Sequence, residues 1–146
     1  DPLAADIVLG SGVPTTVVGL DVTQQTTMDE AFIDRLRDSS GDFGEFIHAI
    51  TRHYFDFYEG VRGERRCPIH DSSAVAYLLA PHLYTTLSGP VRVVDEGIAM
   101  GQTILGRDSA KYQSDAWSDR PDVTVCVGVN SDAVLRLYLE TLASAG

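Results

Sequence analysis

A histidine and an aspartate stand together where an irregular loop leads into an apolar segment of helical character. His70 and Asp71 occupy this junction. Histidine ordinarily changes charge near neutral pH, so His70 can act as an acid that protonates a leaving group, or it can be a loop residue bonded to the backbone. The Asp71 carboxylate can cap the helix by accepting hydrogen bonds from backbone N–H groups, or it can ligate a metal ion. From the residues alone, both pairs of interpretations stay open.

Two tyrosines precede this pair on a long helix that the sequence predicts over residues 42–59. Tyr54 and Tyr58 lie one helical turn apart on the apolar face of that helix. Aromatic residues at this spacing most often belong to a core or an interface. A tyrosine can also stack against a planar ligand and relay a proton through its phenol. The residues predicted to share this face are Phe43, Phe46, Ile47, Ile50, Tyr54, Phe57 and Tyr58.

Other polar residues are weaker candidates for a site. Asp21 and Thr23 follow a β-branched strand expected over residues 13–20, at the end where open α/β sheets place ligands. Turn formation explains both residues equally well. The remaining histidines are expected at the surface or in structural roles, and they are His48, His53 and His82.

Strands and helices alternate along the chain without a break in composition, which favours one α/β layer structure. A strand over residues 90–95 is expected to pair antiparallel with one over 101–105. A capping box over residues 27–30 predicts the start of a short helix, and polar segments are expected over 60–66 and 108–121. The other predicted elements are helices over 2–10, 72–80 and from 130 or 131 to 143, and a strand over 123–129.

Composition limits the classes of protein to which the chain can belong. Its 146 residues are 44% hydrophobic, which is enough apolar material for a core. The net charge of −10 argues against binding of nucleic acid polymers, which requires basic patches. No apolar run has the length of a membrane span and no secretory pattern is present, so a cytoplasmic location is expected. Cys67 and Cys126 form neither a disulfide framework nor a metal pair, and both are expected to be reduced thiols.

Four stretches, taken in order along the chain, resemble the inosine-uridine-type nucleoside hydrolases. The segment HDSSAVAYLLAP over residues 70–81 is similar to the C-terminal metal and acid motif of that family. Further similar stretches are DPLAA over 1–5, GLDVT over 19–23 and GQTI over 101–104. The resemblance therefore extends over nearly the whole chain.

The resemblance implies an α/β fold, namely the C-terminal portion of an open sheet flanked by helices. Residues 1–146 then correspond to the C-terminal half of a nucleoside hydrolase-like domain. The family carries an N-terminal aspartate cluster, which supplies most calcium ligands and the general base, and a ribose-binding motif. Neither occurs in this chain, whose sequence starts at Asp1 without an initiator methionine. A fragment that is inactive by itself is therefore expected.

The resemblance also implies an activity and its residues. The complete enzyme is expected to be a calcium-dependent hydrolase that splits ribonucleosides into ribose and free base, in purine and pyrimidine salvage. His70 would be the acid that protonates the departing base, Tyr54 and Tyr58 would contact that base, and Asp71 would be a Ca²⁺ ligand. The implied partner is a small-molecule ribonucleoside, and a homo-oligomer of the complete enzyme is expected.

A second hypothesis belongs to a different class of function. In this hypothesis the chain is a non-catalytic fragment that associates with a partner polypeptide. The missing aspartate cluster favours this hypothesis, as does a sheet that would present an unpaired edge without its first half.

Overall fold

The computed structural model describes residues 1–107 and 115–144, and these fall into two compact units. Unit 1 comprises described residues within 1–19 and 86–127, and unit 2 comprises those within 20–85 and 128–144. Each unit has its own helices and strands. The expected polar segment 108–121 lies partly outside the described residues.

Unit 1 begins with helix α1 (Pro2–Leu9), which matches the helix predicted over residues 2–10. Asp1 caps it by accepting a hydrogen bond from the backbone N–H of Ala4 at 3.0 Å. Pro2 fits the first helical position because its missing N–H would have no partner there. Gly10 follows the last residue of the helix.

A four-stranded open sheet runs in the order β1-β6-β4-β5, and the division between the units falls inside β4 and β6. β1 pairs parallel with β6, whereas β5 pairs antiparallel with β4, as the sequence predicts for residues 101–105. The open sheet and the α/β class expected from the sequence are thus confirmed. The strands are β1 (Thr16–Val18), β4 (Tyr84–Val93), β5 (Thr103–Leu105) and β6 (Asp122–Val129).

Two strands differ in length from the prediction. The strand expected over 13–20 is shortened to β1, because the chain turns into a short helix at Leu20. β4 begins at Tyr84 rather than near residue 90, which agrees with the preference of aromatic and β-branched residues for strands. Asp21 therefore lies in a helix and not at the end of a strand.

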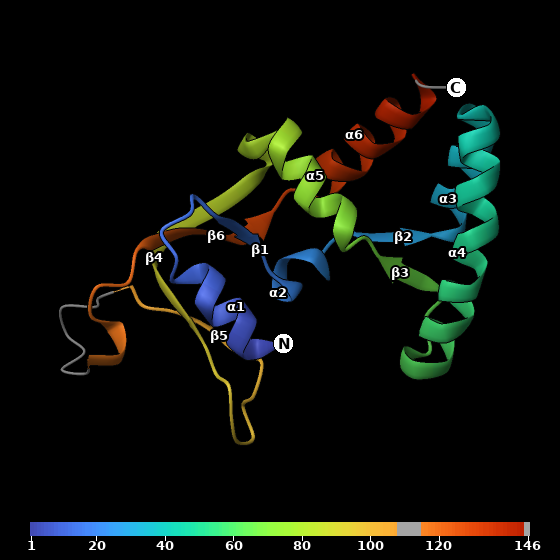
Figure 1. Ribbon diagram of the computed structural model, residues 1–146. Helices are drawn as coiled ribbons and strands as arrows, with labels where there is room; N and C mark the ends of the chain where they lie inside the picture. Colours follow the sequence, from blue (N-terminus) through green and yellow to red (C-terminus); the bar gives the residue numbers. More distant parts are fainter. Residues whose placement is uncertain (108–114, 145–146) are drawn as a thin grey trace. The chain divides into compact units, whose positions relative to one another are not determined.

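The core of unit 1 lies between α1 and the sheet (Figure 1). Alternate residues of a strand point to the same face, so Val91 and Val93 of β4 both face this core. The buried residues are Leu9, Val91, Val93 and Val123, and Ala5, Val17, Leu105 and Val125 pack against them.

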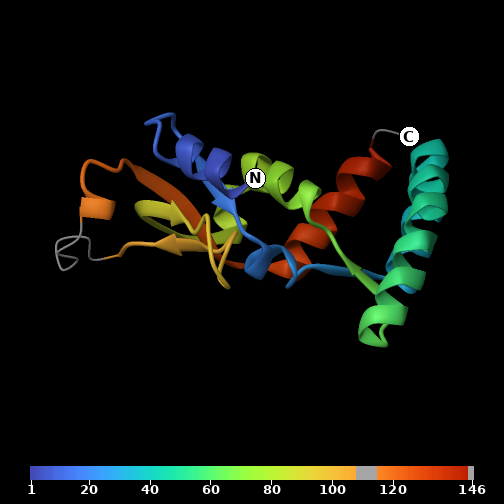
Figure 2. The same cartoon turned by 60° about the horizontal axis from the view of Figure 1, so that its bottom comes forward.

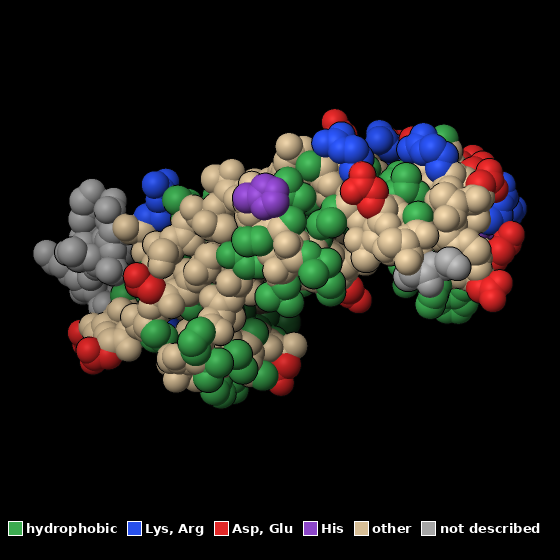
Figure 3. Space-filling view, turned by 90° about the horizontal axis from the view of Figure 1, so that it is seen from above, with side chains coloured by type: hydrophobic (Ala, Val, Ile, Leu, Met, Phe, Trp, Pro, Cys, Tyr) green, Lys and Arg blue, Asp and Glu red, His purple; other side chains and the backbone are tan. Residues whose placement is uncertain are grey.

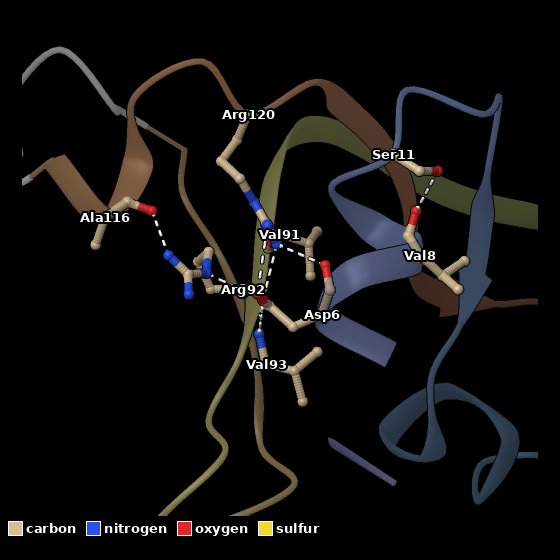
Figure 4. A network of polar contacts seen from close by, with 8 residues as sticks. All are labelled: Asp6, Val8, Ser11, Val91, Arg92, Val93, Ala116 and Arg120. Atoms are coloured by element: carbon tan, nitrogen blue, oxygen red, sulfur yellow. Dashed lines mark hydrogen bonds and ion pairs between the residues drawn. The ribbon is translucent and has the colours of Figure 1, made fainter. Parts of the chain in front are cut away.

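A partly buried ionic network joins α1 to the sheet of unit 1 (Figure 4). The Asp6 carboxylate accepts hydrogen bonds from Arg120 at 2.8 Å, from Arg92 at 3.0 Å and from the Val93 backbone N–H at 2.9 Å. Arg120 also donates to the Val91 carbonyl at 2.7 Å. Arg120 comes from the segment that the sequence suggests is merely polar, yet its side chain is largely buried.

Unit 2 is mainly helical, with one short antiparallel ribbon in which Met28 of β2 lies opposite Cys67 of β3. Helices α5 and α6 lie side by side in both views of the ribbon (Figures 1 and 2). The elements are α2 (Leu20–Thr23), β2 (Thr27–Asp29), α3 (Glu30–Ser39), α4 (Gly41–Arg62), β3 (Arg66–Pro68), α5 (Asp71–Leu79), the 3-10 helix η1 (Pro81–Leu83) and α6 (Ser131–Ala143).

Two helix starts in unit 2 differ from the prediction. The capping box expected from Thr27 is wrong, because residues 27–29 pair as β2. Asp29 is the cap instead, and its side chain accepts a hydrogen bond from the Phe32 N–H at 2.8 Å. At α5 the capping position is His70, no side chain caps the helix, and Asp71 is its first residue. The interpretation of Asp71 as a helix cap is therefore wrong.

Helix α4 is longer than predicted and buries a different face. It extends to Arg62 and ends at Gly63, whose φ of +73° suits glycine, so the predicted polar loop 60–66 is partly helical. Its buried residues are Gly44, Thr51 and Phe55. A Cβ at Gly44 would lie only 2.5 Å from the Leu36 carbonyl oxygen, so this glycine allows α3 and α4 to approach closely. The predicted apolar face is instead largely exposed, as Phe43, Phe46, Ile50, Tyr54 and Phe57 show.

The α6 cap, the histidines of α4 and the cysteines agree with the prediction except at His48. The α6 helix has the predicted Asn130 cap, whose side chain accepts from Ala133 N–H at 3.2 Å. His53 is exposed as expected, but His48 is half-buried, with Nε2 3.5 Å from an Asp34 carboxylate oxygen. Both cysteines are unpaired and buried. Across the described ranges, no helix is long and apolar enough to cross a membrane.

Candidate active site

A cleft of about 340 Å³ in unit 2 contains the His70–Asp71 junction. Its walls come from β2, from α4, from the β3–α5 junction and from α6. Three of the four residues predicted for the site line it. The lining residues are Met28, Ile47, Ile50, Thr51, Tyr54, Cys67, Pro68, Ile69, His70, Asp71, Ser72 and Tyr138.

The His70 ring lies between two hydroxyl groups. Its Nδ1 is 2.7 Å from Oγ1 of Thr23, and its Nε2 is 3.4 Å from the phenol oxygen of Tyr58. The side chain is half-buried, so the ring is held from both sides while part of it faces the cleft. A ring with partners on both nitrogens has a defined orientation, which a proton donor requires.

The two tyrosines occupy different places around His70. Tyr58 is half-buried, its ring packs edge-on against Phe57, and the Arg62 guanidinium lies 5.4 Å from its centroid. Tyr54, one turn earlier, is exposed and lines the cleft. Tyr58 can therefore form a hydrogen bond with His70, whereas the exposed Tyr54 ring can stack against a planar ligand.

Hydrogen bonds hold the junction itself in position. The Ile69 backbone N–H donates to the Thr26 carbonyl at 3.0 Å, and the buried Ser73 hydroxyl donates to the Ile69 carbonyl at 2.7 Å. Tyr84 donates its phenol proton to the Ser73 carbonyl at 2.9 Å. Sequence reasoning missed these supporting residues, because a serine or threonine that bonds to backbone has no distinctive spacing.

Asp71 lies at the edge of the cleft with its side chain exposed. Because it does not cap α5, its carboxylate oxygens are available to a ligand. Calcium takes about six to eight oxygen ligands, so Asp71 fits as one of them. The described ranges contain no group of three or more His, Cys, Asp or Glu residues that could hold a metal ion. Further ligands would have to come from elsewhere.

Among the lining residues that were not predicted for the site, two carry titratable groups, Tyr138 and Cys67. Tyr138 reaches it from α6, and burial raises the pKa of its phenol, while a hydrogen bond with Ser72 acts in the opposite direction. Burial raises the pKa of the Cys67 thiol to about 11, so this cysteine is protonated and unreactive at neutral pH. The position of Tyr138 follows from the contact between α5 and α6, which the sequence does not reveal.

Of the weaker candidates, the structure brings only Thr23 to the site. Asp21 is exposed on α2, and His82 is exposed in η1. Neither lines the cleft. Thr23 is 4% exposed and contacts His70 directly.

Comparisons with known proteins identify the family. Residues 1–136 match the inosine-uridine preferring nucleoside hydrolases, and the chain belongs to that family. It is 32% identical to a probable uridine nucleosidase 2 of Arabidopsis thaliana, over 97% of this chain and 44% of the relative. It is 30% identical to the pyrimidine-specific ribonucleoside hydrolase RihA of Salmonella typhi, again over 97% of this chain and 44% of the relative.

Solved structures show the same relationship. A plant nucleoside hydrolase, the PpNRh1 enzyme, superimposes with a TM-score of 0.92 at 28% identity, over 99% of this chain and 46% of that one. A purine-preferring ribonucleoside hydrolase from Gardnerella vaginalis gives a TM-score of 0.81 at 33% identity, over 99% and 44%. The chain thus spans less than half the length of these relatives. The expectation that it corresponds to part of such an enzyme is confirmed.

Proposed function

We propose that a complete enzyme containing this chain hydrolyses the N-glycosidic bond of ribonucleosides and releases ribose and free base. The observation that carries this proposal is the position of His70. Its ring is fixed between Thr23 and Tyr58 at the edge of a cleft, beside the free carboxylate of Asp71. Membership of the nucleoside hydrolase family supports the same conclusion.

His70 is the proton donor in this proposal. As the bond between the sugar carbon and the base nitrogen breaks, its electron pair moves onto the base. Protonation of the base by His70 makes it a better leaving group, an effect that commonly contributes about a hundredfold to ten-thousandfold in rate. Tyr58 orients the acid through Nε2, and Tyr54 contacts the base from the cleft wall.

Asp71 is proposed as a calcium ligand. When bound, the ion would hold the ribose hydroxyls and a water molecule near the sugar. Asp71 would supply one oxygen ligand to the ion. The remaining ligands, and the base that activates the water, would come from the rest of the complete enzyme, outside the region that this chain covers. For this reason, the chain alone is proposed to be inactive.

The relatives include proteins named as uridine nucleosidase, as pyrimidine-specific and as purine-preferring, so the names do not favour one base. The proposed substrate class is therefore ribonucleosides as a whole. A role in nucleoside salvage, a cytoplasmic location and homo-oligomerisation of the complete enzyme stay predictions.

Product analysis tests the proposed reaction. The complete enzyme is incubated with inosine or uridine in phosphate-free buffer, and the products are separated by chromatography. Free base and unphosphorylated ribose in equal amounts are expected. Base release that requires phosphate would mean phosphorolysis instead, and no release from either nucleoside would overturn the proposal.

A second candidate function is association with a partner polypeptide, and one observation favours it. The α4 face predicted to be buried is largely exposed, with Phe46 61% and Phe57 57% accessible. Hydrophobic side chains are also visible at the surface in Figure 3. Since the chain spans only 44% of its curated relatives, the partner would be a polypeptide equivalent to the rest of them. Sedimentation of the chain with and without such a polypeptide tests this association. A well-folded monomer that does not bind the added polypeptide would count against this second function.

A further inference from the structure

The buried hydroxyl of Thr23 contacts His70 on the ring nitrogen that Tyr58 does not reach. Oγ1 of Thr23 lies 2.7 Å from Nδ1 of His70 and 3.3 Å from the Leu20 carbonyl oxygen. Thr23 is 4% exposed, so water does not readily replace either contact. A side chain that contacts Nδ1 in this way can determine which of the two ring nitrogens carries the proton of the neutral His70 ring.

The hydroxyl has one proton and two acceptors within reach, so the protonation states must be consistent with both contacts. If Thr23 donates to Nδ1, the contact with the Leu20 carbonyl has no proton. If Thr23 donates to the Leu20 carbonyl, its oxygen accepts a hydrogen bond from Nδ1–H of His70, and both contacts are hydrogen bonds. Threonine commonly bonds to a carbonyl three or four residues earlier, and Leu20 is three residues before Thr23. The second arrangement satisfies both distances.

We propose that Thr23 is a positioning residue that keeps a proton on Nδ1 of the neutral His70 ring and leaves Nε2 as the nitrogen that faces Tyr58. This inference rests on the proposed function, in which His70 is the acid. It extends that function by assigning the donor atom and the residue that selects it.

The arrangement separates the two ring nitrogens. The hydrogen bonds from Nδ1–H to Thr23 and from the Thr23 hydroxyl to the Leu20 carbonyl do not involve Nε2. Nε2 lies 3.4 Å from the phenol oxygen of Tyr58 and is therefore the nitrogen left for proton donation to the departing base. In that step the proton moves from Nε2 to the base nitrogen as this nitrogen receives the electron pair of the broken bond, and the bonds to Thr23 and Leu20 do not change.

The fold keeps Thr23 in place independently of His70. The neighbouring Val22 is 1% exposed, and the Thr26 backbone N–H donates to the Thr23 carbonyl at 3.2 Å. A β-branched side chain also has few allowed rotamers. The hydroxyl is therefore preorganised when the histidine ring arrives from a position 47 residues further along the chain.

Nitrogen NMR of histidine tests the proposal on the chain without substrate. The chain is labelled with ¹⁵N-histidine, and long-range ¹H–¹⁵N spectra are recorded in alkaline buffer, where the rings are neutral. The chain has four histidines, and the spectrum of His70→Gln identifies the His70 signals by their loss. The expected result is an Nδ1–H ring in the wild type and in Thr23→Ser, and a shift toward the Nε2–H form in Thr23→Val.

Thr26→Val is the matched control. Thr26 is 0% exposed, but its hydroxyl bonds to Ser131 and not to His70, so this variant should keep the wild-type tautomer. An Nε2–H ring in the wild type would overturn the proposal even if Thr23→Val failed to fold. An unchanged tautomer in a folded Thr23→Val would do the same. Because the spectra need no turnover, this result is separate from that of the hydrolysis assay.

Discussion

The phenol oxygen of Tyr58 lies 3.4 Å from Nε2 of His70, which joins the end of α4 to the start of α5. Tyr54 lies one turn earlier on the same helix and lines the cleft. The two tyrosines, which the sequence presents as equivalent, therefore have different neighbours. Of the two tyrosines, Tyr58 is the one in a position to orient the proposed acid.

Replacement of His70 by alanine in the complete enzyme should lower kcat for purine nucleosides by about a hundredfold to ten-thousandfold, because the departing base loses its proton donor. Calcium affinity should remain nearly unchanged, since His70 is not a proposed ligand. Steady-state kinetics with inosine and a calcium titration measure the two effects. His82→Ala, an exposed position in η1 outside the cleft, is the control and should behave as wild type. Unchanged inosine turnover in His70→Ala would remove His70 from the mechanism.

The tyrosine assignment predicts a contrast between two phenylalanine variants. Tyr58→Phe should lower kcat by about fivefold, which corresponds to the loss of one hydrogen bond of about 1 kcal/mol. Tyr54→Phe should leave kcat nearly unchanged because the ring remains, whereas Tyr54→Ala should raise KM. Kinetics with one purine and one pyrimidine nucleoside check these values. Equal loss of kcat in both phenylalanine variants would contradict the distinction.

Asp71→Asn should weaken calcium binding and raise KM together, because the proposed metal ligand loses its charge. The stability of α5 should change little, since Asp71 does not cap that helix. Calcium titration of the complete enzyme and the calcium dependence of KM measure the effect. Asp132→Asn removes a carboxylate from the first turn of α6 without affecting the cleft, and serves as the control. A normal calcium dependence in Asp71→Asn would exclude Asp71 from the metal site.

The sequence anticipates which residues lie together at the candidate site better than it anticipates the packing around them. His70 and Asp71 are adjacent in a motif, so their proximity needs no tertiary information. The contact of Thr23 with His70 spans 47 positions and appears only when α2 is placed beside the β3–α5 junction. The prediction of the buried face of α4 was wrong, because periodicity detects an apolar stripe on a helix but not the element against which the helix packs. The close approach at Gly44 selects a different side of the helix for contact with α3.

The Asp6 network was missed for a related reason. Asp6, Arg92 and Arg120 are far apart in the sequence, and a charged residue in a polar segment normally indicates a solvated surface. Their side chains converge only because α1 packs on the sheet. The network should therefore be a major determinant of the stability of unit 1.

Asp6→Asn should destabilise unit 1 by about 3 kcal/mol, since it leaves the largely buried Arg120 and the half-buried Arg92 without their carboxylate. Asp95→Asn, an exposed position, should change the free energy of unfolding by less than about 0.5 kcal/mol. The protein contains one tryptophan, Trp117, which lies in unit 1, so denaturant titration followed by its fluorescence reports on this unit. A change in Asp6→Asn as small as in the control would show that the network contributes little.

The same network predicts how stability depends on pH. Burial tends to raise the pKa of the Asp6 carboxyl, but the Val93 N–H, Arg92 and Arg120 outweigh it, so the pKa lies below its ordinary value. A lowered pKa means that the stabilisation is fully present above the unfolded-state pKa of about 3.9, and that it is lost as the pH falls through the folded-state value. The difference in unfolding free energy between wild type and Asp6→Asn should thus be constant near neutral pH and shrink in stronger acid. A difference that grows as the pH falls would show that the carboxylate is not the stabilising form.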